Sequence, residues 1–559
     1  MTFFPLEVVL PLFIAYFNSA LATASVKAPS LFSRDLVVDG QNATIASLSL
    51  SSDKQSYYLL LKTGQIAFRV ALDTGSSDLW LTSSACPSPT CKESPHYPLS
   101  YQNPTFVAVN ANTTAFKASY GDGTAVSGFV AKETITIGNM TVPQQAFGLI
   151  TQSDVTLVDQ VSGILGLGFP RLSTINRSSN DSSPLLATLT QKGLLDYPLF
   201  GLSLTRDAHG TLALGAIDGS VVKKVEDIEW HEVVQFPPIG IETNETSYWH
   251  WALPMRDLSV DGSPLKLSPS YPDKTGGLPV ALFDVGTSGI YGPWSDVAQL
   301  YGEIPESRLV DANGQWAVPC ETRANMSFAF GSRRFTLQPV DYLIGPTAGN
   351  PRLCLSWPRA TNPTPDGIDW VLGAPFLRSV YSVFSYGIDT KEPPMIGFYA
   401  LNATNATASI SSFFSSFSAT VATTLPNSLL NTPTHTIPPY GLNASFTAPT
   451  GAVVSSGLAN STYSPILGQE PTNFSALPII TASPTVSTFI FTDPTGGVSI
   501  SISTSEPVGS VVLGVPPGWT ENSAMSRIRI SADGFWMVLL PVILISWTST
   551  FNVLDIAFH

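Results

Sequence analysis

Two segments of the chain each place an aspartate directly after an apolar run. The first reads ALDTGSSDLW (71–80) and the second reads ALFDVGTSGI (281–290), so Asp73 and Asp284 are both followed closely by a glycine and a hydroxyl residue. A glycine at this place lets a second backbone approach the aspartate closely. Two carboxylates that meet cannot both ionise easily, so they share one proton. Such a pair suits acid–base hydrolysis through an activated water molecule.

The two aspartate motifs belong to a longer internal repeat. The glycine-rich segments GILGLG (163–168) and WVLGAP (370–375) follow them at nearly the same offset. The two aspartates are 211 residues apart, and the matching glycines Gly166 and Gly373 are 207 residues apart. Repetition of both features predicts two related lobes. If a two-fold axis relates these lobes, the two aspartates can meet at that axis.

The elements that must position these motifs are predicted to be β-strands. Between residues 41 and 400, short apolar or alternating runs are separated by Gly, Pro, Asn and Asp, which is typical of an all-β body. Helical patterns are few and short, near 182–192 and 294–301. The predicted strands include 57–62, 66–72, 133–138, 200–204 and 211–217.

Over about residues 45–400 the chain resembles the pepsin-like aspartic proteases. A lone Asp-Thr-Gly is weak support, but its extension through Trp80 is highly specific. The segment SYGDGTAVSGFV (119–130) resembles the family's flap hairpin, and FLRSVYSVF (376–384) resembles its closing strand. The overall layout is similar to the fungal GPI-anchored, yapsin-like branch. The resemblance implies a bilobal, all-β fold with pseudo-two-fold symmetry and an aspartic-type endopeptidase that is active at acidic pH without a cofactor or metal.

The resemblance also implies roles for the residues around the aspartates. Asp73 and Asp284 are the expected catalytic dyad. Tyr120 is the expected flap tyrosine, hydrogen-bonded to Trp80. The other residues are expected to support the dyad (Thr74, Gly75, Ser76, Gly286 and Thr287) or to bind the substrate backbone at the flap tip (Gly121 and Asp122).

Val285 departs from the family pattern, because the family has Thr or Ser at this position. In the family this hydroxyl bonds to the backbone of the opposite lobe, and the equivalent hydroxyl of the first motif bonds to the backbone of the second lobe. Thr74 can still make its half of this exchange, whereas Val285 cannot. A lost bond that leaves a buried backbone group without a partner costs about 1–3 kcal/mol. An active protease is therefore expected, with a weak enzyme or a catalytically silent cell-wall or adhesion protein as the alternatives.

The chain has four cysteines, Cys86, Cys91, Cys320 and Cys354. An even number in an oxidising compartment predicts disulfides, and three pairings are possible. The simplest pairing forms one small and one larger loop, and zinc binding is disfavoured by the spacing. The resemblance implies the bonds Cys86–Cys91 and Cys320–Cys354.

The N-terminal residues are predicted to be a secretory signal peptide, 1–24. An apolar run (8–17) precedes an Ala-rich cleavage pattern that ends near Ala22 or Ala24. Residues 25–44 are then a short prosegment or N-terminal extension with only two bases, Lys27 and Arg34. Family prosegments are usually longer and basic, so weak or absent zymogen inhibition is expected.

The C-terminal residues match the layout of a GPI-attachment signal. Small residues at 522–524 precede a ten-residue spacer and an apolar run at 535–547. Asn522 is the predicted attachment residue, with Ser523 next, and 523–559 would be removed. The alternative is a transmembrane anchor, but the apolar run is shorter than the roughly 20 residues needed to span a bilayer.

Residues 401–522 are predicted to be a disordered, glycosylated stalk. They are rich in Ser, Thr, Asn, Ala and Pro, and no Lys or Arg occurs between residues 401 and 520. Twelve N-glycosylation sequons fit a secreted protein. They lie at Asn42, Asn112, Asn139, Asn176, Asn180, Asn244, Asn325, Asn402, Asn405, Asn443, Asn460 and Asn473.

Composition agrees with this division of the chain. The net charge is −14 and charged residues make up only 12% of the 559 residues, so no basic excess exists to bind nucleic acid. The remaining residues divide into an N-terminal lobe, 45–200, and a C-terminal lobe, 201–400. We expect a monomer at the cell surface, held at the plasma membrane or cell wall by a GPI lipid, with proteins or peptides as substrates.

Overall fold

The computed structural model describes residues 42–175, 182–205, 209–236, 246–347, 350–401, 448–469, 471–481, 487–492, 498–503 and 512–519. The predicted signal peptide, most of the 25–44 segment, Asn522 and the C-terminal tail lie outside these ranges, as do the sequons at Asn176, Asn180, Asn244, Asn402, Asn405 and Asn443. Among the described residues, no helix has the length and apolar character needed to cross a membrane.

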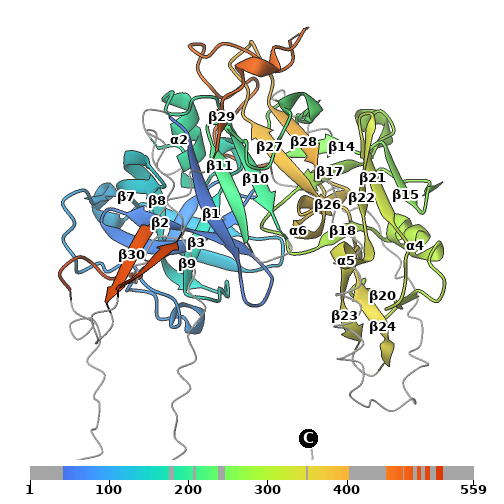
Figure 1. Ribbon diagram of the computed structural model, residues 1–559, viewed down its shortest axis with the longest axis horizontal. Coiled ribbons are helices and arrows are strands. Elements are labelled where there is room, and N and C mark those ends of the chain that lie inside the picture. The colour runs from blue at the N-terminus through green and yellow to red at the C-terminus, as the bar shows by residue number, and fades with distance from the viewer. Residues whose placement is uncertain are drawn as a thin grey trace, which may run out of the picture. The chain divides into compact units, whose positions relative to one another are not determined.

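The N-terminal lobe is built around β3, which ends on Asp73 (Figure 1). Seven of the eight residues of β3 are buried, as expected for a strand that is covered on both faces. Its sheet has 14 strands and continues beyond this lobe. The strands of the lobe are β1 (Thr44–Leu50), β2 (Tyr57–Thr63), β3 (Ile66–Asp73), β4 (Leu79–Thr82), β5 (Val107–Ala108), β6 (Ala115–Ser119), β7 (Ala125–Ile137), β8 (Met140–Ser153) and β9 (Val161–Gly166), with α2 (Leu185–Gln191) after them.

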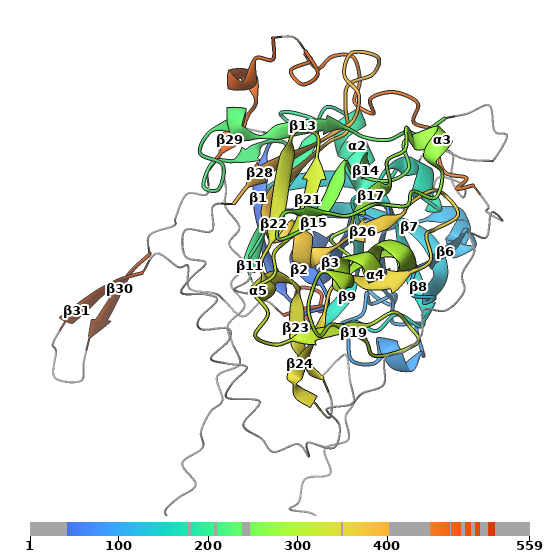
Figure 2. The ribbon, with the colours of Figure 1, turned by 90° about the vertical axis from the view of Figure 1, so that its right-hand side faces the viewer.

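The C-terminal lobe contains three smaller sheets (Figure 2). The strands are β14 (Ala252–Pro254), β15 (Asp257–Val260), β16 (Ser263–Pro264), β17 (Val280–Phe283), β18 (Ile290–Pro293), β19 (Arg308–Leu309), β20 (Trp316–Pro319), β21 (Met326–Phe330), β22 (Arg333–Leu337), β23 (Leu343–Thr347), β24 (Asn350–Ser356), β25 (Arg359–Thr361) and β26 (Trp370–Leu372). The helices are α3 (Pro272–Thr275), α4 (Trp294–Gly302), α5 (Pro339–Tyr342) and α6 (Ala374–Leu377). The helices expected near 182–192 and 294–301 are thus confirmed by α2 and α4.

The two lobes repeat one strand arrangement. In the N-terminal lobe β3, β9, β4 and β8 are neighbours in that order, and in the C-terminal lobe β17, β26, β18 and β25 are neighbours in the same order. In both series the first pair is parallel, the second antiparallel and the third parallel. This match confirms that the sequence repeat reflects two related lobes.

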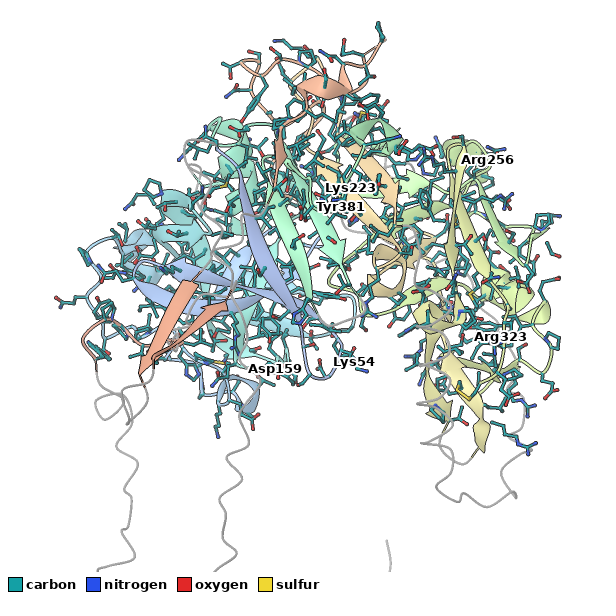
Figure 3. All side chains as sticks on the ribbon, viewed as in Figure 1. Lys54, Asp159, Lys223, Arg256, Arg323 and Tyr381 are labelled. Atoms are coloured by element: carbon teal, nitrogen blue, oxygen red, sulfur yellow. A yellow bond between two sulfur atoms is a disulfide. The ribbon has the colours of Figure 1, made fainter. Side chains whose placement is uncertain are left out.

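The strands that join the lobes belong to the 14-stranded sheet. The aromatic core crosses this junction, since the rings of Phe169 and Trp251 are 4.3 Å apart and those of Phe200 and Phe384 are 4.8 Å apart. Tyr381, labelled in Figure 3, is fully buried on one of these strands. The strands are β10 (Leu199–Leu204), β11 (His209–Leu214), β13 (Glu229–Glu232), β27 (Val380–Ser385) and β28 (Met395–Ala400).

The predicted closing strand at 376–384 begins later than expected. Phe376 and Leu377 are the end of helix α6, and β27 starts at Val380. Pro375 is at the start of α6, where proline is tolerated because the first N–H groups of a helix have no intrahelical acceptor.

The segment 448–481, drawn in orange in Figures 1 and 2, packs on the folded body, so the prediction of a disordered stalk is wrong for these residues. Val454 and Leu467 join its hydrophobic core. In addition, β29 (Ile479–Ile480) pairs in parallel with β12 (Ile217–Asp218). The composition is polar on average, but several of its apolar residues, among them Val454, Leu467 and Ile480, are buried by surfaces far away in the sequence. Further on, β30 (Ser487–Thr492) and β31 (Val498–Ser503) form an antiparallel pair.

Candidate active site

Asp73 and Asp284 meet across the two lobes. The N–H of Gly75 donates to Oδ1 of Asp73 at 2.9 Å and to Oδ1 of Asp284 at 3.0 Å. Both aspartates are nearly buried, with 7% and 8% of their surface exposed. One donor that serves both carboxylates places their inner oxygens next to each other.

Hydroxyl groups hold the outer oxygens of the two carboxylates. The Oγ of Ser76 donates to Oδ2 of Asp73 at 2.5 Å, and the Oγ1 of Thr287 donates to Oδ2 of Asp284 at 2.6 Å. The N–H of Gly286 also donates to Oδ1 of Asp284 at 2.9 Å. These bonds fix the orientation of both carboxylates and favour their ionised form.

The two glycines leave no room for a side chain. A Cβ atom on Gly286 would lie 2.5 Å from Oδ1 of Asp73, and one on Gly75 would lie 3.0 Å from Oδ2 of Asp284. Each glycine therefore lies against the carboxylate of the opposite lobe. Any larger residue would push the dyad apart, which explains the glycine at both positions.

Burial, followed by the negative charge of Asp284, raises the pKa of Asp73 well above its ordinary value. The bond from Ser76 acts in the opposite direction but is the smaller effect. Asp73 thus keeps a proton at pH values where an exposed aspartate would have lost it. One protonated and one ionised carboxylate are the combination required for acid–base work on a single substrate.

Thr74 connects the two aspartate loops. Its hydroxyl donates to the carbonyl oxygen of Phe283 at 2.9 Å and accepts the N–H of Val285 at 2.9 Å. Val285 is fully buried and has only methyl groups to offer in return. As predicted, Thr74 bonds to the opposite loop and the side chain of Val285 makes no hydrogen bond in the other direction. The backbone N–H of Val285 has Thr74 as its partner.

Tyr120 directly follows β6, which ends at Ser119, where the flap hairpin turns. The Nε1–H of Trp80 donates to the hydroxyl oxygen of Tyr120 at 2.6 Å, as expected from the sequence. Burial, with a further contribution from the charge of Asp73, raises the pKa of Tyr120. Its hydroxyl therefore keeps its proton near the dyad over the physiological pH range.

Asp122 lies in the turn at the flap tip, and its carboxylate forms bonds within that turn. Oδ1 of Asp122 accepts the N–H of Thr124 at 2.9 Å and its hydroxyl at 2.7 Å, so the carboxylate caps its own turn. Gly121 and Gly123 are exposed, and a Cβ atom on either would meet nothing within 4 Å. The tip therefore presents backbone groups, and the Asp122 side chain shapes the turn.

Asp78 is a supporting residue that the sequence analysis missed. It is buried and accepts hydrogen bonds from Ser173 Oγ at 2.5 Å and from the N–H of Thr174 at 2.7 Å. These bonds tie the first aspartate motif to the segment after β9. The available signal was an acidic residue inside the first motif, directly before the apolar residues Leu79 and Trp80.

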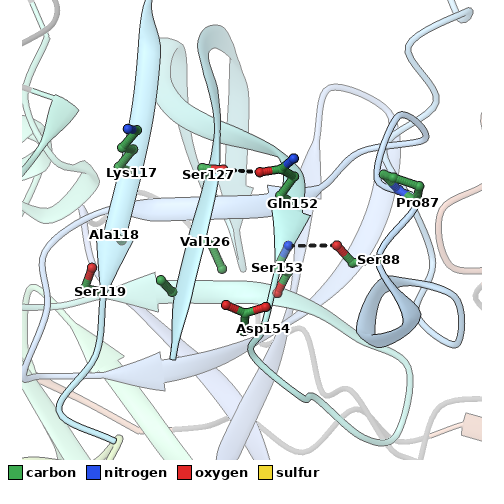
Figure 4. A pocket seen from close by; sticks show the side chains of 11 residues that line it. Pro87, Ser88, Lys117, Ala118, Ser119, Val126, Ser127, Gln152, Ser153 and Asp154 are labelled. Atoms are coloured by element: carbon green, nitrogen blue, oxygen red, sulfur yellow. Dashed lines mark hydrogen bonds between the residues drawn. The ribbon is translucent and has the colours of Figure 1, made fainter. Parts of the chain in front are cut away.

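A groove of about 510 Å³ lies beside the flap hairpin, and neither aspartate lines it (Figure 4). The disulfide loop forms one wall, since Ser88 Oγ accepts the N–H of Ser153 at 3.1 Å. The groove is lined by Pro87, Ser88, Lys117, Ala118, Ser119, Ala125, Val126, Ser127, Gln152, Ser153 and Asp154. It flanks the flap and takes no part in holding the dyad.

Both expected disulfides are present, Cys86–Cys91 and Cys320–Cys354. Among the described residues, no group of His, Cys, Asp and Glu side chains is arranged to hold a metal ion. Six sequon asparagines lie within the described ranges, at Asn42, Asn112, Asn139, Asn325, Asn460 and Asn473.

Comparison with known proteins identifies the family. Residues 56–392 match the family model of the eukaryotic aspartyl proteases. The chain is 28% identical to an aspartic protease of Phaffia rhodozyma over 62% of its length and 78% of the relative's. It is 30% identical to cathepsin D of Dictyostelium discoideum, over 66% of this chain and 91% of the relative. It is also 30% identical to cathepsin E of Mus musculus, over 57% and 74%.

The family match covers more than half of the chain and includes both aspartate motifs, the flap and both disulfides. Its relatives are named as aspartic proteases and cathepsins. The chain belongs to the eukaryotic aspartyl protease family and is an aspartic-type endopeptidase.

Proposed function

We propose that Asp73 and Asp284 together hydrolyse peptide bonds by activating a water molecule. The observation that carries this assignment is the single Gly75 N–H, which is within 3.0 Å of a carboxylate oxygen of each aspartate. A water molecule bound between two such oxygens is positioned to lose a proton to one carboxylate while the other donates a proton.

In this mechanism the ionised carboxylate takes a proton from water, and the water oxygen bonds to the peptide carbonyl carbon. The protonated carboxylate gives its proton to the carbonyl oxygen, which forms a tetrahedral diol. The C–N bond then breaks as the nitrogen receives a proton from the dyad, and the carbonyl forms again as one hydroxyl of the diol gives its proton to the dyad. The raised pKa of Asp73 supports its role as the initial acid. The reaction forms no covalent intermediate with the protein.

The flap supports this proposal by covering the substrate. Tyr120 is anchored to Trp80, and the exposed tip at Gly121 presents backbone groups that suit an extended peptide. A closed flap excludes water from the dyad and strengthens its electrostatic interactions.

The test is cleavage of a denatured protein at pH values from about 3 to 7, where a dyad that shares one proton is expected to act. We expect cleavage that pepstatin inhibits and that Asp73→Asn or Asp284→Asn abolishes. Asp273→Asn, the same change at an exposed aspartate of helix α3, is the matched control and should retain activity. Absence of cleavage by the folded wild-type protein at every pH would refute the assignment.

A catalytically silent wall or adhesion protein is the less favoured alternative. Val285 removes one hydroxyl, but Thr74 still bonds to both Val285 and Phe283, and both carboxylates keep their donors. The missing hydroxyl of residue 285 is therefore expected to weaken the hydrogen bonding around the dyad without abolishing its activity.

We further propose that the enzyme reaches the cell surface and is held there by a GPI lipid at Asn522, with proteins or peptides outside the cell as its substrates. The proposal rests on the apolar N-terminal run, the sequons and the C-terminal layout. Treatment of intact cells with phosphatidylinositol-specific phospholipase C should release the active protein. Retention of residues 523–559 in the mature protein would contradict the GPI proposal and favour a transmembrane anchor.

A further inference from the structure

The segment 448–481 lies beyond the residues that match the family, which end at residue 392. It nevertheless buries apolar side chains against the body. Val454, Ala459, Leu467 and Ile480 are each at most 5% exposed. Burial of this kind is the main favourable contribution to packing.

The segment bonds to residues that precede β10, on the N-terminal side of the junction. The N–H of Gly451 donates to the carbonyl of Arg171 at 3.0 Å, and the Arg171 guanidinium donates to the carbonyl of Gly451 at 2.9 Å. The hydroxyl of Tyr463 donates to the carbonyl of Leu195 at 2.8 Å. The segment is thus tied to the N-terminal lobe at two separate places.

The same segment bonds to residues of the C-terminal half. The N–H of Tyr248 donates to the carbonyl of Val454 at 2.8 Å, and the N–H of Val454 donates to Ser247 Oγ at 2.9 Å. The N–H of Leu458 donates to the carbonyl of Tyr386 at 2.9 Å. The segment therefore bonds to both halves of the body.

Glu392 joins all three parts. Its Oε2 atom accepts the N–H of Ile466 at 3.0 Å, the N–H of Leu467 at 2.9 Å and the hydroxyl of Tyr197 at 2.5 Å. Tyr197 belongs to the N-terminal side and Glu392 follows β27, so one buried carboxyl group links both halves to the segment.

A series of hydrogen bonds connects the segment to the first aspartate loop. Leu458 holds the backbone of Tyr386, whose hydroxyl donates to the carbonyl of Leu167 at 2.7 Å. The N–H of Leu167 in turn donates to the carbonyl of Asp73 at 2.7 Å. Loss of the segment should therefore weaken the backbone hydrogen bonds around Leu167 in the N-terminal lobe.

We infer that residues 448–481 are an intramolecular clamp that ties the two lobes together, so that the unit which folds as one body extends at least to residue 481. Both halves bond to the same segment, and its buried side chains lie in the shared core. The clamp places residues 448–481 in the folded body, beyond the predicted boundary at residue 400.

The test compares two neighbouring residues of the clamp in the full-length protein. Val454 is 5% exposed, whereas Val453 is 43% exposed, so Val454→Ala and Val453→Ala are the same chemical change in different surroundings. We expect Val454→Ala to lower the unfolding temperature by about 3 °C or more, as loss of buried methyl groups does, and Val453→Ala to leave it unchanged.

Hydrogen exchange shows whether the clamp acts on both lobes. In Val454→Ala, exchange should become severalfold faster in residues 167–175 and in residues 386–392, and Val453→Ala should match the wild type. Faster exchange confined to 448–481, or equal behaviour of the two variants, would overturn the clamp.

A second pair of variants checks the result at another point. A Cβ atom on Gly457 would lie 2.1 Å from the backbone nitrogen of Ile388, while one on Gly302 meets nothing within 4 Å. Gly457→Ala should therefore speed exchange in residues 386–392, and Gly302→Ala should not. Neither readout needs catalysis, so an inactive wild-type protein would refute the proposed dyad and leave the clamp to be judged on exchange and stability.

Discussion

The hydroxyl oxygen of Thr74 lies 2.9 Å from the backbone nitrogen of Val285, across the two lobes. A side chain of the first aspartate loop therefore hydrogen-bonds to the backbone of the second loop, whereas the side chain of Val285 makes no hydrogen bond to the first loop. This asymmetry at the centre of a repeated strand arrangement is a direct consequence of one residue in the sequence.

Val285→Thr should restore the exchange. By the symmetry of the lobes, the new hydroxyl would face the backbone of Leu72 and Thr74, as Thr74 faces that of Phe283 and Val285. Two added buried hydrogen bonds, worth about 1 kcal/mol each, should raise the free energy of unfolding, measured by urea denaturation.

Thr74→Val is the opposite change and removes the bonds to both Phe283 and Val285. It should lower the free energy of unfolding by about 2–3 kcal/mol, because two buried backbone groups lose a partner. Thr74→Ser keeps the hydroxyl and is the control. Equal stability of the valine and serine variants would contradict this account of the loop contact.

The dyad should make both stability and activity depend on pH. The folded-state pKa of Asp73 is raised above its unfolded value, so the folded state holds this proton more tightly. Its contribution to stability is complete below the unfolded pKa and is lost as pH rises through the folded pKa. Cleavage should decline over the same rise in pH, because the initial acid is lost.

The measurement is the unfolding temperature of the wild type and of Asp73→Asn between about pH 4 and pH 8, a range that begins near the ordinary pKa of an exposed aspartate. The asparagine variant cannot titrate at this position. The wild type should therefore lose stability relative to the variant as pH rises, and parallel curves would show that Asp73 does not carry the shifted proton.

The two disulfides should differ in their contributions to stability. Cys320–Cys354 closes a loop of 34 residues and Cys86–Cys91 closes one of 5. In the chain-entropy model these loops correspond to about 4 and about 2 kcal/mol at 25 °C. Paired replacement by alanine, followed by urea denaturation, should show the larger loss for the C-terminal disulfide.

The carboxyl group of Glu392 should stabilise the clamp at acidic pH as well as at neutral pH. Burial raises its pKa, and its three closest donors all bond to Oε2. Among the described residues, Oε1 receives a bond only from Ser385 at 3.3 Å, so this oxygen can carry the proton. Glu392→Gln copies the protonated form and should match the wild type at pH 4, whereas Glu392→Ala should be less stable at every pH.

The sign of this effect can be checked on the same variants. An acid with a raised folded pKa contributes stability at low pH and loses that contribution as pH rises. The wild type should therefore lose stability relative to Glu392→Gln between pH 4 and pH 7. A glutamine variant that is strongly destabilised at pH 4 would show that the clamp requires the charged carboxylate.

Several features of the site were predictable because their chemistry is local. The aspartates, the two glycines and the hydroxyls of Ser76 and Thr287 lie within a few residues of one another in each motif. A strand that ends on Asp73 needs only its own apolar run and pairing partners. The repeat of these motifs was also sufficient to predict two lobes.

The hydrogen-bond partners of Asp122 and Asp78 could not be predicted from the sequence. The sequence placed Asp122 at the tip, but its carboxylate bonds to Thr124 two residues later. Asp78 was overlooked because its partners, Ser173 and Thr174, are 95 and 96 residues away. The choice among competing hydrogen-bond partners depends on distances that only the folded chain sets.

By itself, the sequence determined the family, the two aspartates and the missing hydroxyl at Val285, since each depends on residue type at a defined position. Only the tertiary structure decided that one Gly75 N–H serves both carboxylates and that residues 448–481 belong to the folded body. A few apolar side chains in a polar segment carry no periodic pattern. Their burial is determined by complementary surfaces on Arg171, Tyr248 and Glu392, which the fold brings together from distant parts of the chain.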